Sequence, residues 1–184
     1  MKIFRAIFAV YCIIAFLATF LIVIPCYFII FNLWSKEKAP HVAHKLSKFW
    51  AHLIFALFFV RCKIENKSYI DPKTQYVFVA NHLSMLDIPA YAASCSNTFR
   101  FLAKAELAKV PLLGYVINNL YITVNRSDRA DRHKSIEKMK ATIDSGLSVF
   151  LAPEGTRNTS GAPLLEFKDG AFRLAIAAQV PMAV

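Results

Sequence analysis

Hydrophobic residues fill the first part of the chain and alternate with polar segments in the rest. Residues 6–35 contain no charged side chain, and this run exceeds the roughly 20 apolar residues that span a bilayer. Pro25 removes a backbone donor inside it, so the run predicts either one spanning helix or a long helix followed by a short one. A cleaved signal peptide is disfavoured, because the run is too long and no small-x-small site closes it. Residues 49–60 are too short to span and suit an interfacial or packed helix, so we expect an N-terminal membrane-embedded helical pair.

The pattern changes near residue 63, after which short apolar runs alternate with amphipathic segments. Residues 129–144 form the clearest expected helix, because Ile136, Met139 and Ile143 recur at helical spacing. Strands that alternate with helices predict an α/β domain with a mostly parallel sheet and flanking helices, over residues 64–184, after membrane-associated helices over residues 1–63. The other expected elements are strands at 76–80, 99–103, 121–124 and 148–152 and a helix at 170–179.

Composition and charge connect this organisation to a membrane. The chain is 57% hydrophobic with a mean hydropathy of +0.42, too apolar for an ordinary soluble domain. Of its net charge of +10, residues 1–63 carry eight Lys and Arg against one Glu. Basic residues beside apolar segments favour an anionic membrane surface over nucleic acid as the partner. Four lysines follow the first apolar run and only Lys2 and Arg5 precede it, which favours placement of the α/β domain on the cytoplasmic face of the inner (plasma) membrane.

A histidine and an aspartate follow the strand expected over residues 76–80, where α/β sheets collect their ligands. His82 and Asp87 are five residues apart, so only a turn before a helix could bring them together. The aspartate would then accept one imidazole N–H and leave the other ring nitrogen to act as a general base. Ser84 lacks a Gly-x-Ser-x-Gly setting, so the nucleophile would be a substrate hydroxyl. An ordinary helix cap beside a packed histidine is the alternative.

A second polar cluster, residues 153–157, follows the fourth expected strand. Gly155 permits a close approach of the backbone, and the planar guanidinium of Arg157 suits a phosphate or a carboxylate. A surface turn with a salt bridge is the alternative. Lys104 and Arg126 also lie near the ends of expected strands, so with Arg157 they could form a phosphate pocket. A base that activates a hydroxyl beside a phosphate site favours a phospholipid precursor as substrate. The four cysteines show no metal-ligand spacing and indicate neither a zinc site nor a disulfide framework.

Taken together, these motifs resemble the glycerolipid acyltransferases typified by 1-acyl-sn-glycerol-3-phosphate acyltransferase. The resemblance covers residues 65–184, and several spaced motifs in one order are far more specific than His-x₄-Asp alone. In order, the motifs are Asn-His-x-x-x-x-Asp at residues 81–87, a block from lysine to arginine at 104–126, Leu-Ala-Pro-Glu-Gly-Thr-Arg-Asn at 151–158, Phe-Lys-Asp-Gly-Ala at 167–171, and the start of a strand led by Val-Pro at 180–181.

The resemblance implies transfer of a fatty acyl group from acyl-CoA or acyl carrier protein to the free hydroxyl of lysophosphatidate, giving phosphatidate. No metal or other cofactor is expected, and membrane lipids are the expected partners. His82 would deprotonate the acceptor hydroxyl and Asp87 would orient His82. Lys104, Arg126 and Arg157 would hold the acceptor phosphate, and Glu154 and Gly155 would shape the glycerol-phosphate site. The full substrate-binding set implied is Asn81, Lys104, Arg126, Glu154, Gly155, Thr156 and Arg157.

Several positions depart from the family pattern. Asn118 or Asn119 stands where many members have glycine, Asn125 replaces a common aspartate, and Asn158 replaces a common serine. The chain ends at Val184, just inside the block that begins with Val-Pro at residues 180–181, so the domain is expected to be short at its C-terminal end. Two alternatives stay open: another acceptor, such as glycerol 3-phosphate, another lysophospholipid or a lyso-ornithine lipid, and a non-catalytic membrane-anchored remnant that binds lipid.

Overall fold

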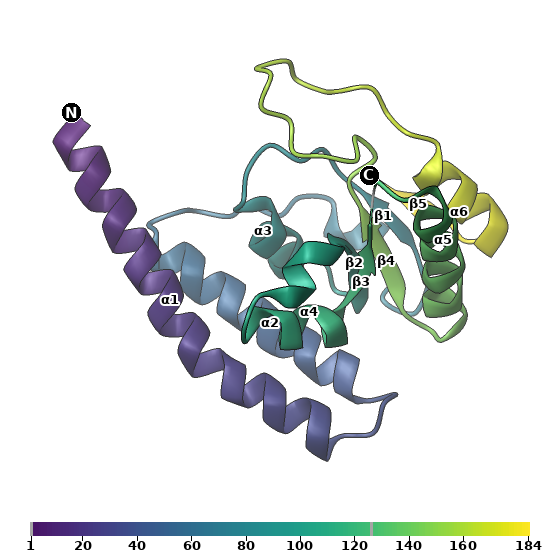
Figure 1. Ribbon diagram of the computed structural model, residues 1–184, viewed down its shortest axis with the longest axis horizontal. Coiled ribbons are helices and arrows are strands. Elements are labelled where there is room, and N and C mark those ends of the chain that lie inside the picture. The colour runs from purple at the N-terminus through teal and green to yellow at the C-terminus, as the bar shows by residue number, and fades with distance from the viewer. Residues whose placement is uncertain (1, 126) are drawn as a thin grey trace. The chain divides into compact units, whose positions relative to one another are not determined.

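The computed structural model describes residues 2–125 and 127–184 (Figure 1). The chain divides into two compact units. The first comprises Met1–Glu65 together with Ile88–Cys95, and the second comprises Asn66–Asp87 together with Ser96–Val184. The division into domains at residues 63 and 64 stays a prediction.

The first unit contains two long helices, α1 (Lys2–Leu33) and α2 (Ala39–Leu57). Three contacts join them, and their order shows that the helices run antiparallel. The Tyr11 hydroxyl donates to the Leu57 carbonyl at 3.1 Å, the Trp50 indole donates to the Thr19 hydroxyl at 3.0 Å, and the hydroxyls of Tyr27 and Ser47 lie 2.7 Å apart.

Pro25 lies inside α1 and does not break it. The expectation of a long helix followed by a short one is therefore not met. A proline costs one backbone hydrogen bond, but the apolar residues on both sides keep the helix continuous until the turn after Leu33. Most side chains of α1 are exposed, and the helix is long and apolar enough to cross a membrane. Its embedding in a membrane stays a prediction.

Residues 49–57 of the expected apolar stretch belong to a longer helix, and residues 58–60 lie past its end. α2 begins at Ala39, with Pro40 in its first turn, where a proline is tolerated. One face of α2 is buried, including Ala43, Ala51 and Ile54. The unit also contains most of α3 (Asp87–Ser94). The Lys48 ammonium donates to the Cys95 carbonyl at 3.1 Å, just past the end of α3, which satisfies a group that the helix terminus leaves open.

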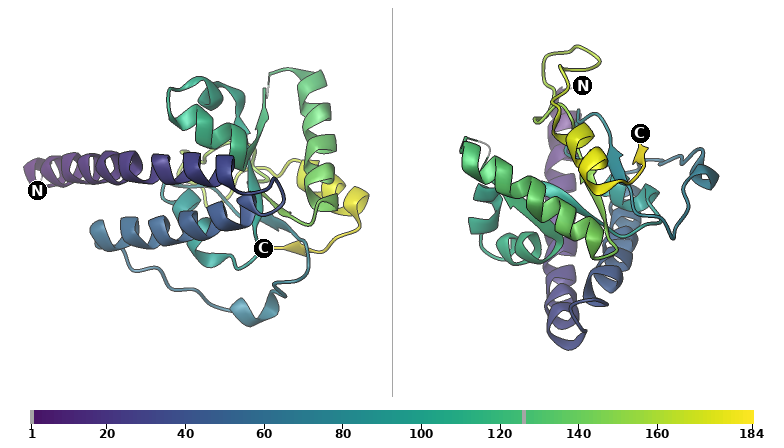
Figure 2. Two further views of the ribbon diagram at one scale, coloured as in Figure 1. Left: turned by 90° about the horizontal axis from the view of Figure 1, so that it is seen from below. Right: turned by 90° about the vertical axis from the view of Figure 1, so that its right-hand side faces the viewer.

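The second unit is built on a five-stranded sheet in which every described pair of strands is parallel. The strand order is β3-β2-β4-β1-β5, so the predicted α/β class is confirmed. Figure 2 shows α4 (Leu113–Leu120) and α5 (Arg129–Asp144) on opposite sides of the strands. The strands are β1 (Val77–Val79), β2 (Phe99–Lys104), β3 (Tyr121–Val124), β4 (Ser148–Leu151) and β5 (Met182–Ala183).

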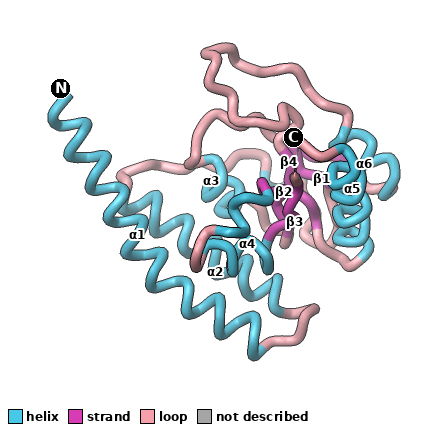
Figure 3. The backbone as a smooth tube through the Cα atoms, viewed as in Figure 1, coloured by secondary structure: helices cyan, strands magenta, loops and turns pink. Residues whose placement is uncertain are grey.

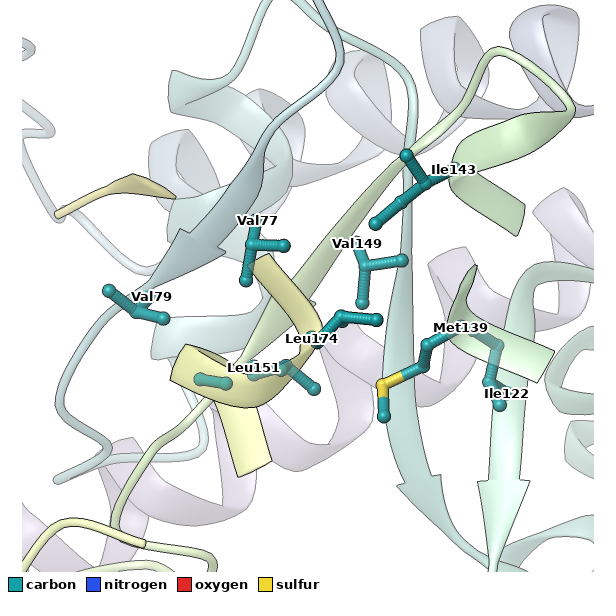
Figure 4. Packing of buried hydrophobic residues seen from close by; sticks show 9 residues of the cluster. Val77, Val79, Ile122, Met139, Ile143, Val149, Leu151 and Leu174 are labelled. Carbon is teal, nitrogen blue, oxygen red and sulfur yellow. The ribbon is translucent and has the colours of Figure 1, made fainter. Parts of the chain in front are cut away.

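The two faces of this sheet carry different side chains, because residues alternate along a strand. One face is aliphatic and packs under α5 and α6 (Gly170–Ala178), where Val77, Val149 and Leu174 are fully buried (Figure 4). The other face carries aromatic rings, with the ring of Phe150 at 5.3 Å from those of Phe99 and Phe101. The short central strands are thus buried on both faces, as expected of a parallel sheet.

The sequence pattern did not predict two short elements between β2 and β3. They are η2 (Ala105–Lys109), a 3-10 helix, and α4. Each is too short for a helical period to emerge, and the turn between them places Leu112 at a positive φ of 62°. A further 3-10 helix, η1 (Lys67–Tyr69), precedes the sheet.

Gly114 is the residue that lets α4 lie against η2, and its replacement by Ala is expected to destabilise the protein. A Cβ atom at position 114 would lie 2.2 Å from the Ala108 carbonyl oxygen, so the backbone would have to shift. Strain of this kind costs about 1–3 kcal/mol. Denaturant unfolding in detergent micelles should show this loss for Gly114→Ala and almost none for Gly170→Ala, where a Cβ meets open space. Equal stability of the two variants would contradict this account of the η2–α4 contact.

Candidate active site

The carboxyl ends of β1 and β4 bring the two predicted polar clusters together. Val79 pairs with Leu151, so both loops leave the sheet at the same level. The loops are also joined directly, because the Asn158 backbone amide donates to the His82 carbonyl at 2.7 Å. Figure 3 shows the long loop that leads from β4 to α6. This edge of a parallel sheet is where α/β folds bind ligands.

His82 and Asp87 are in contact. The His82 Nδ1 atom lies 2.9 Å from the Asp87 Oδ2 atom, and the two side chains are 19% and 23% exposed. Because an ionised carboxylate only accepts hydrogen bonds, Nδ1 carries the proton in the neutral imidazole and Nε2 keeps a free lone pair. The pair therefore has the arrangement of a base and its orienting group.

The turn between them explains how residues five apart can meet. The backbone amides of Leu83 and Ser84 both donate to the Asp87 Oδ2 atom at 2.8 Å. The same oxygen thus orients the imidazole and closes the turn that precedes α3. With three donors on one oxygen, the carboxylate is held in place before any ligand arrives.

The loop after β4 begins with a tight turn. The Gly155 amide donates to the Ala152 carbonyl at 2.9 Å, and Gly155 has a φ of +73°, a conformation that favours glycine. Glu154 is 2% exposed, and neither of its carboxylate oxygens has a hydrogen-bond partner among the residues that the structure describes. A buried carboxylate without a donor is costly, so Glu154 is poised to accept a hydrogen bond. Thr156 and Arg157 are exposed.

The three predicted phosphate-binding cations differ in their surroundings. The exposed Arg157 side chain forms no ion pair among the residues that the structure describes. The Lys104 ammonium, at the end of β2, lies 3.2 Å from the Glu106 carboxylate. Hydrogen bonds from its own backbone amide and from Lys104 lower the pKa of Glu106. Both partners are exposed, so this ion pair is weak and an anionic ligand could displace it. Arg126 lies outside the described residues, and Asn81 is exposed beside His82.

Asn158 joins the two loops through contacts that the sequence pattern did not reveal. Its side chain is buried, donates to the Ala162 carbonyl at 2.7 Å and accepts from the amide and hydroxyl of Ser160. Its backbone amide holds the His82 carbonyl. The departure from the common serine therefore places a larger hydrogen-bonding side chain where the two loops meet. Within residues 2–125 and 127–184, no cluster of three or more His, Cys, Asp or Glu side chains could hold a metal ion.

Comparisons with known proteins agree with this fold. A model of the acyltransferase family matches residues 61–183. The crystal structure of the 1-acyl-sn-glycerophosphate acyltransferase PlsC from Thermotoga maritima is similar, with a TM-score of 0.77 and 29% identity over 98% of this chain and 73% of that one. The chain therefore belongs to the acyltransferase family.

Curated relatives support the same assignment. The chloroplastic 1-acyl-sn-glycerol-3-phosphate acyltransferase LPAT1 of Arabidopsis thaliana is 32% identical over 90% of this chain and 46% of its own length. The human 1-acyl-sn-glycerol-3-phosphate acyltransferase alpha is 32% identical over 68% of this chain and 45% of its own. An uncharacterized acyltransferase of Schizosaccharomyces pombe is 37% identical over 66% of this chain and 45% of its own. The chain spans about half the length of these relatives.

Proposed function

We propose that the protein is a membrane-bound O-acyltransferase that transfers a fatty acyl group from acyl-CoA or acyl carrier protein to lysophosphatidate, giving phosphatidate. The observation that carries this proposal is the 2.9 Å contact between His82 and Asp87 at the carboxyl edge of the sheet. LPAT1, the human relative and PlsC are named as acyltransferases of this lysophospholipid, which supports lysophosphatidate as the acceptor. The reaction needs no cofactor beyond the acyl donor.

The proposed chemistry begins with the free lone pair of His82. Its Nε2 atom takes the proton of the acceptor hydroxyl as the hydroxyl oxygen attacks the thioester carbonyl carbon. The new C–O ester bond forms, the C–S bond breaks, and the imidazolium returns the proton to the departing thiolate. Asp87 stabilises the imidazolium in between, which is the role of an orienting carboxylate beside a general base.

The acceptor is proposed to lie against the loop after β4. The buried carboxylate of Glu154 would accept a hydrogen bond from the glycerol part, and the Gly155 turn would let the acceptor approach the backbone. Arg157, Lys104 and Arg126 would attract the phosphate, with Asn81 and Thr156 beside them. Charge-assisted hydrogen bonds of this kind contribute about 1.5–3 kcal/mol each.

Membrane attachment is proposed to come from the first unit. α1 exposes long apolar side chains, including Ile3, Phe4 and Ile22 at 78%, 74% and 70% exposure. Such a surface is unfavourable in water and suits lipid. The lysines that follow α1 favour placement of the catalytic unit on the cytoplasmic face of the membrane.

Replacing Arg157 by Ala is expected to weaken binding of the acceptor and to leave binding of the acyl donor unchanged. The KM for lysophosphatidate should rise by about 10-fold or more, because a cation that meets the phosphate is lost, whereas the KM for acyl-CoA should stay unchanged. Initial rates on membrane fractions, with labelled acyl-CoA and varied lysophosphatidate, measure both. Wild-type transfer to a lyso-ornithine lipid but not to lysophosphatidate would contradict the proposed acceptor, and no transfer to any lysolipid would favour the lipid-binding alternative.

A further inference from the structure

Lys168 lies across the Gly155 turn although it is thirteen positions further along the chain. Its backbone amide donates to the Pro153 carbonyl at 2.9 Å, which fixes the start of the side chain beside the turn. From there the side chain covers the α-carbon of Gly155. A Cβ atom at position 155 would lie 3.1 Å from the Lys168 Cε atom and 3.2 Å from Cδ. Only glycine leaves room for this packing without displacing the lysine.

The ammonium of Lys168 is free to bind a ligand. Its Nζ atom lies 3.9 Å from the same Cβ position, directly beside the turn. None of the ion pairs among the described residues involves Lys168, and its neighbour Asp169 pairs with Arg173 at 3.2 Å. Lys168 is exposed and lines an open surface hollow of about 550 Å³ together with Leu165, Glu166, Phe167 and Asp169.

The residue next to Gly155 offers the complementary chemistry. Glu154 is buried, and among the described residues neither of its carboxylate oxygens has a hydrogen-bond partner. Because an unpartnered buried polar group is costly, a ligand that donates a hydrogen bond to Glu154 would be stabilised. The Lys168 ammonium is more than ion-pair distance away, so it does not meet that need directly. A ligand that carries both a hydroxyl donor and an anionic group would satisfy both side chains at once. A glycerol phosphate headgroup has these two groups on one small molecule.

We propose that Lys168 is a phosphate-binding residue of the acceptor site, held over the Gly155 turn so that its ammonium meets the phosphate while Glu154 accepts a glycerol hydroxyl. This inference rests on the proposed function and names a residue that determines specificity for a phosphorylated acceptor. The Phe-Lys-Asp-Gly-Ala motif thereby gains a role that its sequence alone does not indicate.

The competing interpretation is that Lys168 serves only through its aliphatic stem, which packs on Gly155. Two substitutions separate the charge from the stem. Lys168→Met keeps a long unbranched side chain and removes the charge, whereas Lys168→Ala removes both. Lys138→Met on α5 is the matched control, because Lys138 is an exposed lysine that belongs to neither site loop.

The first readout is binding, and it does not depend on turnover. Glycerol 3-phosphate should raise the thermal midpoint of the detergent-solubilised full chain, and glycerol alone should not. The rise should be lost in Lys168→Met and kept in Lys138→Met. A wild-type protein that glycerol 3-phosphate does not stabilise, or a Lys168→Met variant stabilised as well as the wild type, would overturn the inference.

The second readout measures KM and kcat separately, with lysophosphatidate as the acceptor. Lys168→Met should raise the acceptor KM by about 10- to 100-fold, leave the donor KM unchanged and change kcat little, because one charge-assisted contact is lost. Lys168→Arg should recover most of the loss. If Lys168→Met keeps the wild-type acceptor KM while Lys168→Ala raises it, the contribution of Lys168 comes from its aliphatic stem alone and the inference is wrong. If lysophosphatidate is not turned over but glycerol 3-phosphate binding still depends on Lys168, the proposed function fails and this inference stands.

Discussion

Replacing His82 by Ala is expected to lower acyl transfer to lysophosphatidate by about 10²- to 10⁴-fold, the usual contribution of a general base. The loss should appear in kcat, because the imidazole acts on the acceptor hydroxyl only as the new bond forms. The fold should survive, since the backbone carbonyl of His82 still accepts from Asn158 and the side chain is partly exposed. Initial rates with labelled acyl-CoA give the comparison.

His133→Ala is the matched control for this prediction. His133 is an exposed histidine of α5 and takes no part in the proposed site. It should keep the wild-type rate, and both variants should melt close to the wild type. A His82→Ala protein that is folded and as active as His133→Ala would rule out His82 as the base.

Asp87→Asn is expected to have a comparable effect for a different reason. If the Asn amide nitrogen faces His82, it donates to Nδ1 and forces the imidazole proton onto Nε2, where it blocks the base. If the amide oxygen faces His82 instead, the negative charge that stabilises the imidazolium is still lost. The rate should therefore fall by about 10²-fold or more.

The Asp87 substitution should also weaken the turn before α3. The amides of Leu83 and Ser84 donate to the Asp87 Oδ2 atom, and bonds to a charged acceptor contribute more than bonds to a neutral amide. Thermal unfolding of Asp87→Asn should show a modest loss of stability that His82→Ala does not share. A variant with both the wild-type rate and the wild-type midpoint would contradict the role given to this carboxylate.

The elements that the sequence predicted well are those in which local pattern and tertiary packing agree. The helix expected at residues 129–144 is α5 with the same bounds, because its buried Met139 and Ile143 face the sheet while charged residues face away. The strand expected at 121–124 is likewise β3. Buried strands that are only three or four residues long can still be recognised in the sequence, because turn residues bound them.

The misjudged features depend on contacts that no local pattern contains. Pro25 left open whether one helix or a long and a short helix would form, and the helix stays continuous because one lost hydrogen bond does not outweigh the long apolar helix on both sides of it. The η2–α4 segment depends on the close approach of Gly114 to the Ala108 carbonyl. The packing of Lys168 on Gly155 likewise joins residues that only the fold brings together.

The candidate site likewise combines features that the sequence predicted with features that only the folded structure shows. The positions of His82 and Asp87 at a strand end suggested that they could meet, and the structure adds the turn amides that hold the carboxylate in place. The unpartnered oxygens of Glu154 and the buried amide of Asn158 could not be anticipated, because hydrogen-bond satisfaction is a property of the folded loop. The catalytic and binding roles of these residues stay predictions.

The proposed function requires this chain to make phosphatidate with His82 as the base. The most direct measurement is mass-spectrometric detection of phosphatidate formed from isotope-labelled lysophosphatidate and acyl-CoA, with the wild-type chain and His82→Ala in matched membrane fractions. Labelled phosphatidate is expected from the wild type and almost none from the variant. Equal amounts from both, or no labelled phosphatidate from a folded wild-type protein with either acyl-CoA or acyl carrier protein as donor, would contradict the proposed function.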